Sequence, residues 1–292
     1  MSMGKRAVLM DGTSLARSLL VQTAERAECF RSHTGRAPCL AVVLLGSDRM
    51  TIRHAYLKKV RCDESGLVLR LMQLPWTATS SEVMATVAQL SEDLSVDGIF
   101  VQYPLPAHVD ERAVFDAIAQ EKDVDGLTSH SLSATALGSP GFKSCSAAAI
   151  MLLLDHYGVD LEGMHAVVIG TSRTLGVPTG MMMLARRATV RYCLAETQDL
   201  PTIVRRADLL VTAVGRPKLV RGEWLKPESV VIDASYYSRS EGDVDTAEAM
   251  RPASLISPVP GGVGPVTIAV LLHQTVVAAE QRRLSVGEDN SG

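Results

Sequence analysis

Short apolar runs alternate along this chain with longer stretches of helical periodicity. The runs are continuous and rich in Val, Ile and Leu, which is typical of strands buried on both faces of a parallel sheet. The helical stretches supply the crossovers that parallel strands need, so the pattern predicts an α/β fold. The expected strands are 39–45, 98–101, 165–169, 188–193, 208–214 and 229–233. The expected helices are 14–32, 50–65, 80–94, 110–120, 146–157, 177–187 and 266–283.

The chain length favours two domains. At 292 residues it exceeds the usual size of one compact core. Residues 126–146 are rich in Ser, Gly and Thr and have weak periodicity, so we interpret them as a long connection with a domain boundary near 146. The last expected helix follows a Pro/Gly-dense loop, after which the chain can return to pack on the first domain.

The composition argues against several classes of partner. The 29 basic and 32 acidic residues are spread along the chain, so no basic stripe indicates nucleic acid. The five cysteines include no CxxC pair, which disfavours a disulfide framework or a zinc site and favours a reducing cytosol. The N-terminus has no long apolar stretch and no apolar run reaches about 18 residues, so we expect a cytoplasmic protein without a membrane span.

A glycine-bearing turn follows the expected strand 165–169. It reads Gly170-Thr171-Ser172-Arg173-Thr174-Leu175-Gly176 and leads into an expected helix. Backbone N–H groups and the helix dipole converge at such a helix N-terminus, which suits a pyrophosphate. The spacing is not GxGxxG, so a plain structural turn stays open as the alternative.

Glu196 lies about 20 residues beyond Gly176, after the expected strand 188–193. Dinucleotide folds place the group that meets the adenosine ribose at this distance. A carboxylate accepts from the ribose 2′-hydroxyl and repels a 2′-phosphate, which favours NAD. Arg173 or Arg191 could offset that charge and recruit NADP, and Glu196 could equally be a solvated loop charge.

Six segments stand in order between about Met10 and about Ala278. They are VDGIFVQYPLP (96–106), EKDVDGLTS (121–129), VVIGTSRTLGVP (167–178), ADLLVTAVGRP (207–217), GEWLKPESVVID (222–233) and SPVPGGVGPVT (257–267). Together they resemble the FolD-type methylenetetrahydrofolate dehydrogenase/cyclohydrolase family, and the likeness covers nearly the whole chain. KDVDG and PVPGGVGPVT at their mutual separation are its most specific part.

The resemblance implies two α/β domains. An N-terminal catalytic, folate-binding domain of residues 1–146 is completed by residues 267–292, and residues 147–266 form a Rossmann-like NAD(P)-binding domain. The implied reaction is oxidation of 5,10-methylenetetrahydrofolate to 5,10-methenyltetrahydrofolate with NADP or NAD, with hydrolysis to 10-formyltetrahydrofolate as a second activity. Family members are commonly homodimers joined through their nucleotide domains. No metal is implied.

One helix of the family carries Ser, then Tyr three residues later, then Lys four residues after that. The matching positions here are Thr51, His54 and Lys58. A separation of four residues puts His54 and Lys58 on one helix face, whereas Tyr56 points to another side. We take Lys58 and His54 as catalytic and Thr51 as a substrate-binding hydroxyl. An exposed helix lysine and a partly buried histidine without a catalytic part are the plain alternatives.

The chemistry needs an amine whose pKa is lowered toward neutrality. A protonated His54 beside Lys58 would disfavour charge on both, so the change from Tyr bears on hydrolysis more than on hydride transfer. Gln102 follows the strand 98–101, and its amide can accept from the Lys58 ammonium. Asp125 resembles the family aspartate that holds the amino-pyrimidine edge of the pterin, while Asp123 shapes the loop. We predict that Gln102 and Asp125 are also catalytic, with a capping glutamine and a turn-forming Asp-Gly as the alternatives.

The remaining predicted contacts surround the two ligands. The loop PVPGGVGPVT combines prolines that fix φ with glycines that admit a ligand, so we place Pro260, Gly261 and Gly262 at the substrate, an interdomain turn being the alternative. The predicted cofactor contacts are Gly170, Thr171, Ser172, Arg173, Gly176, Glu196, Gly215, Ser235 and Thr267. Two positions depart from the family. Residues 144–147 read Ser-Cys-Ser-Ala instead of Pro-Cys-Thr-Pro, and Ser235 stands where relatives have glycine near the nicotinamide.

These departures leave two rival interpretations beside the enzyme. One is a folate- or nucleotide-binding paralogue that keeps the ligand site and has reduced or lost hydrolysis, for which His54 and Ser235 are the motivation. The other is a dehydrogenase for an unrelated small substrate, which leaves the KDVDG segment unexplained.

Overall fold

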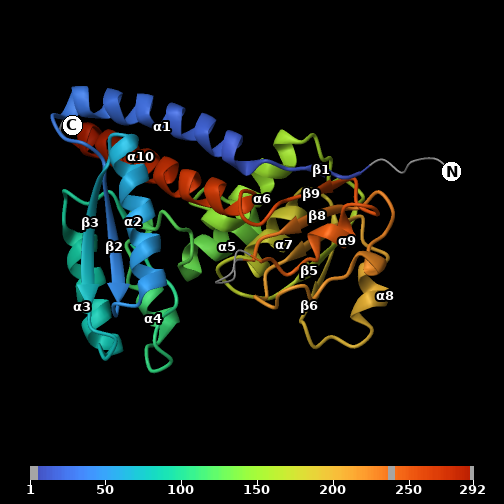
Figure 1. The fold of residues 1–292 in the computed structure, drawn as a ribbon. Coiled ribbons are helices and arrows are strands. Elements are labelled where there is room, and N and C mark those ends of the chain that lie inside the picture. Colours follow the sequence, from blue (N-terminus) through green and yellow to red (C-terminus); the bar gives the residue numbers. More distant parts are fainter. Residues whose placement is uncertain (1–5, 236–240, 290–292) are drawn as a thin grey trace. The chain divides into compact units, whose positions relative to one another are not determined.

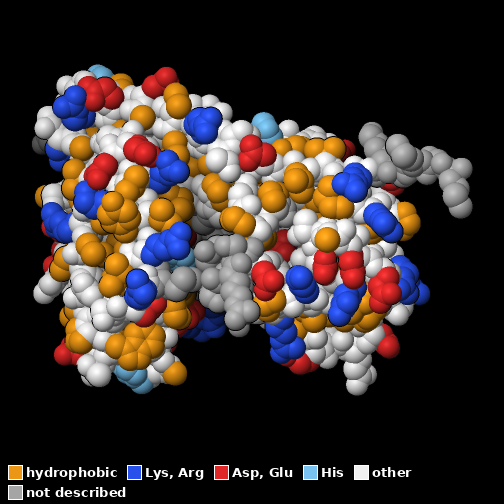
Figure 2. Space-filling view, in the orientation of Figure 1, with side chains coloured by type: hydrophobic (Ala, Val, Ile, Leu, Met, Phe, Trp, Pro, Cys, Tyr) orange, Lys and Arg blue, Asp and Glu red, His pale blue; other side chains and the backbone are white. Residues whose placement is uncertain are grey.

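The computed structural model describes residues 6–235 and 241–289, which form two compact units. We call them the three-stranded unit (residues 17–134, 140–145 and 268–289) and the six-stranded unit (residues 6–16, 135–139, 146–235 and 241–267). Basic and acidic side chains are interspersed on the face of each unit that Figure 2 shows, without a continuous stripe of either sign.

The three-stranded unit is built on a parallel sheet of order β3-β2-β4. The central strand β2 (Cys39–Leu45) is buried along its whole length, as its unbroken apolar sequence requires. Its neighbours are β3 (Val68–Leu74) and β4 (Gly98–Val101). The helices and turns of this part are α1 (Gly12–Thr34), α2 (Arg49–Glu64), α3 (Ser80–Glu92), α4 (Glu111–Asp116), η1 (Gln120–Lys122) and α5 (Ser129–Leu137) (Figure 1).

The six-stranded unit is a parallel sheet of order β1-β9-β8-β7-β5-β6. Its strands are β1 (Val8–Leu9), β5 (His165–Ile169), β6 (Thr189–Cys193), β7 (Leu209–Thr212), β8 (Val230–Asp233) and β9 (Leu255–Ile256). Its helices are α6 (Cys145–His156), α7 (Gly176–Ala185), α8 (Leu200–Val204), α9 (Thr246–Ala249) and the short turn η2 (Gly222–Trp224). The order reverses direction at β5, whose neighbours are β6 and β7, and this makes the carboxyl end of β5 a switch point where α/β sheets bind ligands.

The last helix, α10 (Val263–Asp289), returns to the three-stranded unit, as predicted. It runs beside α1, where Arg26 pairs with Glu280 and Thr23 Oγ1 lies 3.3 Å from His273 Nδ1 (Figure 1). The stretch Val263–Leu284 is long and apolar enough to cross a membrane by composition alone. Because 56% of that window is buried inside the protein, more than half of it is already used in packing.

Two buried charges hold the sheet and its helices together. The fully buried Asp97 accepts from Arg36 Nη1 at 2.6 Å, from Arg282 Nη1 at 3.3 Å and from the Cys39 amide at 2.9 Å. The buried Lys122 donates to the carbonyl oxygens of Leu90, Ser91 and Asp93 at 3.1, 2.6 and 2.8 Å. Lys122 therefore caps the carbonyl groups at the end of α3.

The predicted elements differ from the structure in several places. Residues 126–146 are not a plain connection, because α5 forms within them and α6 begins at Cys145. The strand β3 was not predicted, since its side chains alternate in exposure and Arg70 interrupts its apolar run. Residues 6–16 also group with the six-stranded unit and not with residues 17–134, because Val8 and Leu9 pair with Leu255 and Ile256.

Candidate active site

Lys58 is the centre of the candidate site in the three-stranded unit. It lies on the buried face of α2 with only 7% of its surface exposed. Its Nζ donates to Gln102 Oε1 at 2.8 Å and lies 4.5 Å from the centroid of the Phe100 ring. Burial lowers the pKa of Lys58 to about 8, against the opposing effect of the Asp125 carboxylate. The amine is thus poised to gain or lose a proton near neutral pH.

Gln102 holds the amine from the carboxyl end of β4. Its backbone N–H donates to the Val43 carbonyl at 2.8 Å, which continues the pairing of β4 with β2 for one residue. Its side-chain Nε2 donates to the Tyr103 carbonyl at 2.9 Å. Because that carbonyl needs a donor and the ammonium needs an acceptor, the amide orientation is fixed and Oε1 faces Lys58. The predicted contact between the Lys58 ammonium and the Gln102 amide is therefore present.

Asp125 is half-buried in the loop between η1 and α5. Burial raises the pKa of Asp125 to about 7, and the charge of Asp123 adds to the rise, whereas the Cys145 thiol and Lys58 oppose it. Asp123 accepts from the Leu127 and Thr128 amides at 3.1 and 3.0 Å, so it shapes the loop, as predicted. Both carboxylates accept from backbone N–H groups, and Asp125 also lies close enough to Lys58 for their charges to interact.

Two residues outside the sequence prediction fix this loop. The buried Cys145 thiol donates to the Val124 carbonyl at 3.2 Å and also interacts with the Asp125 carboxylate. Gln274 of α10 donates through Nε2 to the carbonyls of Val124 at 2.7 Å and Lys143 at 3.0 Å. A polar side chain inside the apolar run of the last helix was the one signal that could have found Gln274.

His54 and Thr51 lie one and two turns before Lys58 on α2. Thr51 is buried, and its amide donates to Asp48 Oδ1 at 3.1 Å. His54 is half-buried; burial lowers its pKa, and the Lys58 charge lowers it further. The imidazole is therefore mainly neutral at neutral pH. Tyr56 is 65% exposed and does not share the buried face of Lys58, as predicted.

The six-stranded unit carries the predicted dinucleotide turn between β5 and α7. Gly170 has φ +112°, and a Cβ there would lie 2.7 Å from the Ala213 carbonyl oxygen. A Cβ on Gly176 would lie 2.0 Å from the Gly170 carbonyl oxygen, so both glycines are needed for the close packing of strand, turn and helix. Thr171, Ser172 and Arg173 are exposed between them. This open helix N-terminus fits the pyrophosphate of a dinucleotide.

The strands on either side of β5 contribute loops at the same carboxyl end of the sheet. Glu196 follows β6 and forms an ion pair with Arg216, which follows β7. Gly215 has φ +68° and open space where a Cβ would stand. Sequence reasoning missed Arg216, because 20 residues separate it from its partner.

Ser235 follows β8 and uses its hydroxyl within the loop. The hydroxyl donates to Asp233 Oδ1 at 2.5 Å and accepts from the Asp243 amide at 2.8 Å. The added side chain thus cross-links two turns. Contact of Ser235 with a cofactor stays a prediction.

The loop between β9 and α10 packs within the six-stranded unit. It contains Pro260, Gly261, Gly262 and Thr267, and a Cβ on Gly12 would lie 1.8 Å from the Gly262 carbonyl oxygen. Thr267 donates its hydroxyl to the Val263 carbonyl at 3.2 Å. The three-stranded unit carries the other predicted site residues, Thr51, His54, Lys58, Gln102 and Asp125.

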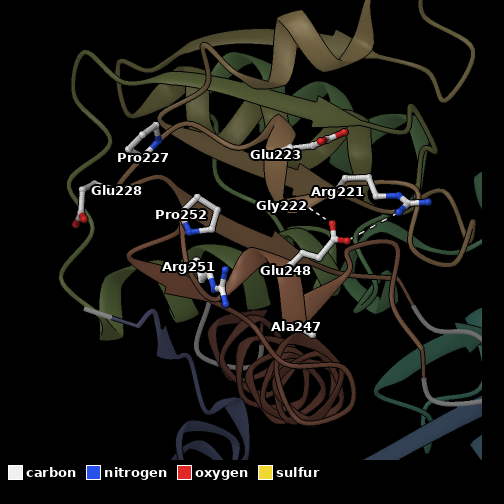
Figure 3. A pocket seen from close by; sticks show the side chains of 9 residues that line it. All are labelled: Arg221, Gly222, Glu223, Pro227, Glu228, Ala247, Glu248, Arg251 and Pro252. Atoms are coloured by element: carbon white, nitrogen blue, oxygen red, sulfur yellow. Dashed lines mark hydrogen bonds and ion pairs between the residues drawn. The ribbon is translucent and has the colours of Figure 1, made fainter. Parts of the chain in front are cut away.

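A separate hollow of about 810 Å³ lies in the six-stranded unit and contains none of the predicted site residues (Figure 3). Its wall includes Glu248, which accepts from the Gly222 amide at 3.1 Å and faces Arg221. Among the described residues, no group of three or more His, Cys, Asp or Glu could hold a metal ion.

These features define a two-unit α/β protein with a buried lysine site and a dinucleotide-binding sheet. Family models match both parts: the tetrahydrofolate dehydrogenase/cyclohydrolase catalytic domain over residues 10–125 and the NAD(P)-binding domain of that family over residues 144–283. The chain belongs to the tetrahydrofolate dehydrogenase/cyclohydrolase family.

Several known proteins resemble the chain along nearly its whole length. Bifunctional protein FolD 1 of Streptomyces avermitilis is 51% identical, over 96% of this chain and 97% of that protein. The crystal structure of the FolD methylenetetrahydrofolate dehydrogenase/cyclohydrolase of Campylobacter jejuni aligns with a TM-score of 0.90 at 37% identity, covering 94% and 99% of the two chains. The Trypanosoma brucei enzyme, solved with NADP and an inhibitor, aligns with a TM-score of 0.91 at 32% identity, covering 95% and 98%.

The raised pKa of Asp125 predicts a stability cost at neutral pH. Between about pH 4 and pH 7, the native state retains a proton on Asp125 that the unfolded chain has already released. The unfolding free energy therefore falls as pH rises through this window. We expect Asp125→Asn, which cannot ionise, to stabilise the protein by roughly 1–3 kcal/mol at pH 7.5 relative to the parent.

Urea unfolding of both proteins at pH 4.5 and pH 7.5 measures this effect. The stabilisation of the variant should shrink toward zero at the lower pH, where both states of the parent retain the proton more fully. A difference that is the same at both pH values would show that Asp125 ionises as readily in the native state as in the unfolded chain.

Proposed function

We propose that this protein oxidises 5,10-methylenetetrahydrofolate with NAD or NADP and hydrolyses the methenyl product to 10-formyltetrahydrofolate. The observation that carries the proposal is the buried Lys58 amine, hydrogen-bonded to Gln102 and facing the charge of Asp125, in a chain of this family. Full-length relatives are bifunctional FolD proteins, which supports the pairing of the two activities.

Asp125 is proposed to bind the pterin head group. A carboxylate can accept two N–H donors from an amino-pyrimidine edge, and such charge-assisted bonds are among the strong ones. Asp125 is partly exposed as a residue, unlike the buried Asp123 of the same loop. Because its pKa lies near neutrality, donors from the ligand would shift Asp125 toward its ionised form and tighten binding.

Lys58 is proposed to move protons at the one-carbon bridge during hydrolysis. Its neutral amine can take a proton from the attacking water, and its ammonium can return one as the ring C–N bond breaks. Gln102 orients the amine without competing for the proton, since an amide does not titrate in this range. In the oxidation step, Lys58 and Asp125 serve to position the substrate.

The nicotinamide cofactor, when bound, accepts the hydride that leaves the one-carbon bridge. Gly170 and Gly176 would bring the backbone close to its pyrophosphate, at the N-terminus of α7. Thr171, Ser172 and Arg173 are exposed there and would contact its phosphate groups. The loops that carry Gly215, Ser235 and Thr267 are proposed to line the rest of the cofactor.

Removal of the Lys58 amine tests the hydrolytic role. We expect Lys58→Met to lower the rate of methenyltetrahydrofolate hydrolysis by roughly 100-fold or more, because a positioned general base is worth that much. In the parent, hydrolysis should accelerate as pH rises through about 8, where Lys58 loses its proton. Absorbance of the methenyl species follows both steps.

Lys59→Met is the matched control, because Lys59 is the exposed neighbour on α2 and pairs with Asp63 at 2.8 Å. It should leave both steps unchanged. Intact hydrolysis in Lys58→Met would remove Lys58 from the mechanism, whereas absence of oxidation in the parent with NAD and with NADP would remove the enzyme.

The second candidate function is folate binding with weakened or lost hydrolysis. His54 favours it, because a half-buried imidazole stands one turn from Lys58 where the family pattern has Tyr. A phenolic hydroxyl can orient the amine, whereas the mainly neutral imidazole of His54 presents a different hydrogen-bonding group beside it.

Restoring the phenol separates the two candidates. We expect His54→Tyr to raise hydrolysis several-fold, up to about tenfold, while oxidation changes little. The ratio of the two rates for the parent and the variant is the measurement. Tight folate binding without turnover in both proteins would favour the binding function.

We further propose a cytoplasmic homodimer joined through the six-stranded unit. The five cysteines are free thiols, which suits a reducing compartment. The strand β6 is an edge strand of the sheet. Leu194, which follows it, is 50% exposed, and Tyr192 and Leu184 are exposed nearby. Two such edges can meet around a twofold axis and cover each other.

A charge at this edge tests the dimer. We expect the parent to sediment at twice its monomer mass of 31.3 kDa and Leu194→Asp to sediment as a monomer, because the aspartate would be buried unpaired. Leu94→Asp, at a 79% exposed leucine of the three-stranded unit, is the control and should remain dimeric. A monomeric parent would contradict the proposal.

A further inference from the structure

We propose that the ion pair between Glu196 and Arg216 makes the protein select NAD over NADP. The inference rests on the proposed nicotinamide-dependent activity and deepens it by naming the cofactor. It also assigns a role to Arg216. This arginine can bind a 2′-phosphate, but Glu196 holds it in an ion pair.

The two residues meet across the proposed cofactor turn. Strands β6 and β7 lie on opposite sides of β5, and the loops that follow them carry Glu196 and Arg216. The loop that follows β5 carries Gly170. The ion pair therefore joins the loops that flank the turn at the switch point of the sheet.

Both loops have fixed backbones. Asp243 is buried and accepts from the Arg216 amide at 2.7 Å, from the Val214 amide at 2.7 Å and from the Thr212 hydroxyl at 2.8 Å. In the loop after β6, the Leu194 amide donates to Thr197 Oγ1 at 2.8 Å. Each charged side chain thus extends from an anchored loop toward the other.

The side chains themselves are exposed, by 53% for Arg216 and 64% for Glu196. An exposed ion pair contributes little to stability, so removal of either charge should leave the fold intact. The pair instead bears on cofactor binding. It lies at the carboxyl end of the sheet, where a bound dinucleotide would place its adenosine ribose beside Glu196.

The ribose substituent then decides between the cofactors. The 2′-hydroxyl of NAD can donate to the Glu196 carboxylate while Arg216 stays paired. A 2′-phosphate has no proton to donate at neutral pH, is repelled by Glu196, and must compete with it for Arg216. Loss of the Glu196 charge alone would leave Arg216 free for the phosphate.

The experiment measures binding directly. Dissociation constants for NAD, NADP and adenosine 2′,5′-bisphosphate are determined by calorimetry for the parent, Glu196→Gln, Arg216→Gln and the double variant. We expect the parent to bind NAD roughly 10- to 100-fold tighter than NADP. Glu196→Gln should tighten NADP and the bisphosphate at least about tenfold, and Arg216→Gln added to it should cancel that gain.

Glu162→Gln is the matched control. Glu162 also forms an ion pair with an arginine of the six-stranded unit, Arg187 at 3.1 Å, and it precedes β5 at the opposite end of that strand. The same charge change at Glu162 should leave the NAD-to-NADP ratio unchanged. A ratio that moves equally in Glu162→Gln would assign the effect to net charge and overturn the proposal.

Two further results would overturn it. One is a parent that binds NADP as tightly as NAD, which would mean that another cation, such as Arg173 or Arg191, holds the phosphate. The other is a Glu196→Gln variant with an unchanged ratio. If the parent binds neither dinucleotide, the proposed oxidation itself fails, and that result is distinct from equal binding of both.

Discussion

The burial of the Lys58 ammonium is the constraint around which the three-stranded unit is organised. A cation removed from water requires nearby acceptors or negative charge, because its desolvation is costly. Gln102 supplies the acceptor from the end of β4, and the ionised form of Asp125, in the loop before α5, favours the ammonium. The helix, the strand end and the loop must therefore be correctly placed relative to one another for the buried ammonium to keep these partners.

The loop that carries Asp125 depends on a helix from the other end of the chain. Gln274 satisfies the Val124 and Lys143 carbonyls, and Arg282 reaches the buried Asp97 beside β4. The return of α10 is therefore more than an addition to the core. It supplies hydrogen bonds to the segment that presents the proposed substrate carboxylate, which explains why the last residues group with the first part of the chain.

The sequence was sufficient where a single local signal determined the element. Strands β2, β4 and β5 match the predicted limits, because each is a continuous apolar run in a buried parallel sheet. The outer strand β3 alternates in exposure and α5 is rich in serine, so both lacked that signal. The proposed site residues Lys58, Gln102 and Asp125 were predicted from their motifs. Gln274 and Arg216 were not, because their roles depend on partners brought near only by folding.

The opposite pKa shifts at Lys58 and Asp125 have one common cause and a shared consequence. Burial disfavours the charged form of each, so the pKa of the base falls to about 8 while that of the acid rises to about 7. The free energy needed to move a proton between them is small when the two values lie so close. Ligand N–H groups bonded to Asp125 would favour its anion, and that anion would in turn favour the Lys58 ammonium. In the proposed mechanism, substrate binding and proton supply are thus linked through Lys58 and Asp125. Burial and the Lys58 charge lower the pKa of His54, so its imidazole is mainly neutral and adds no third charge to that pair.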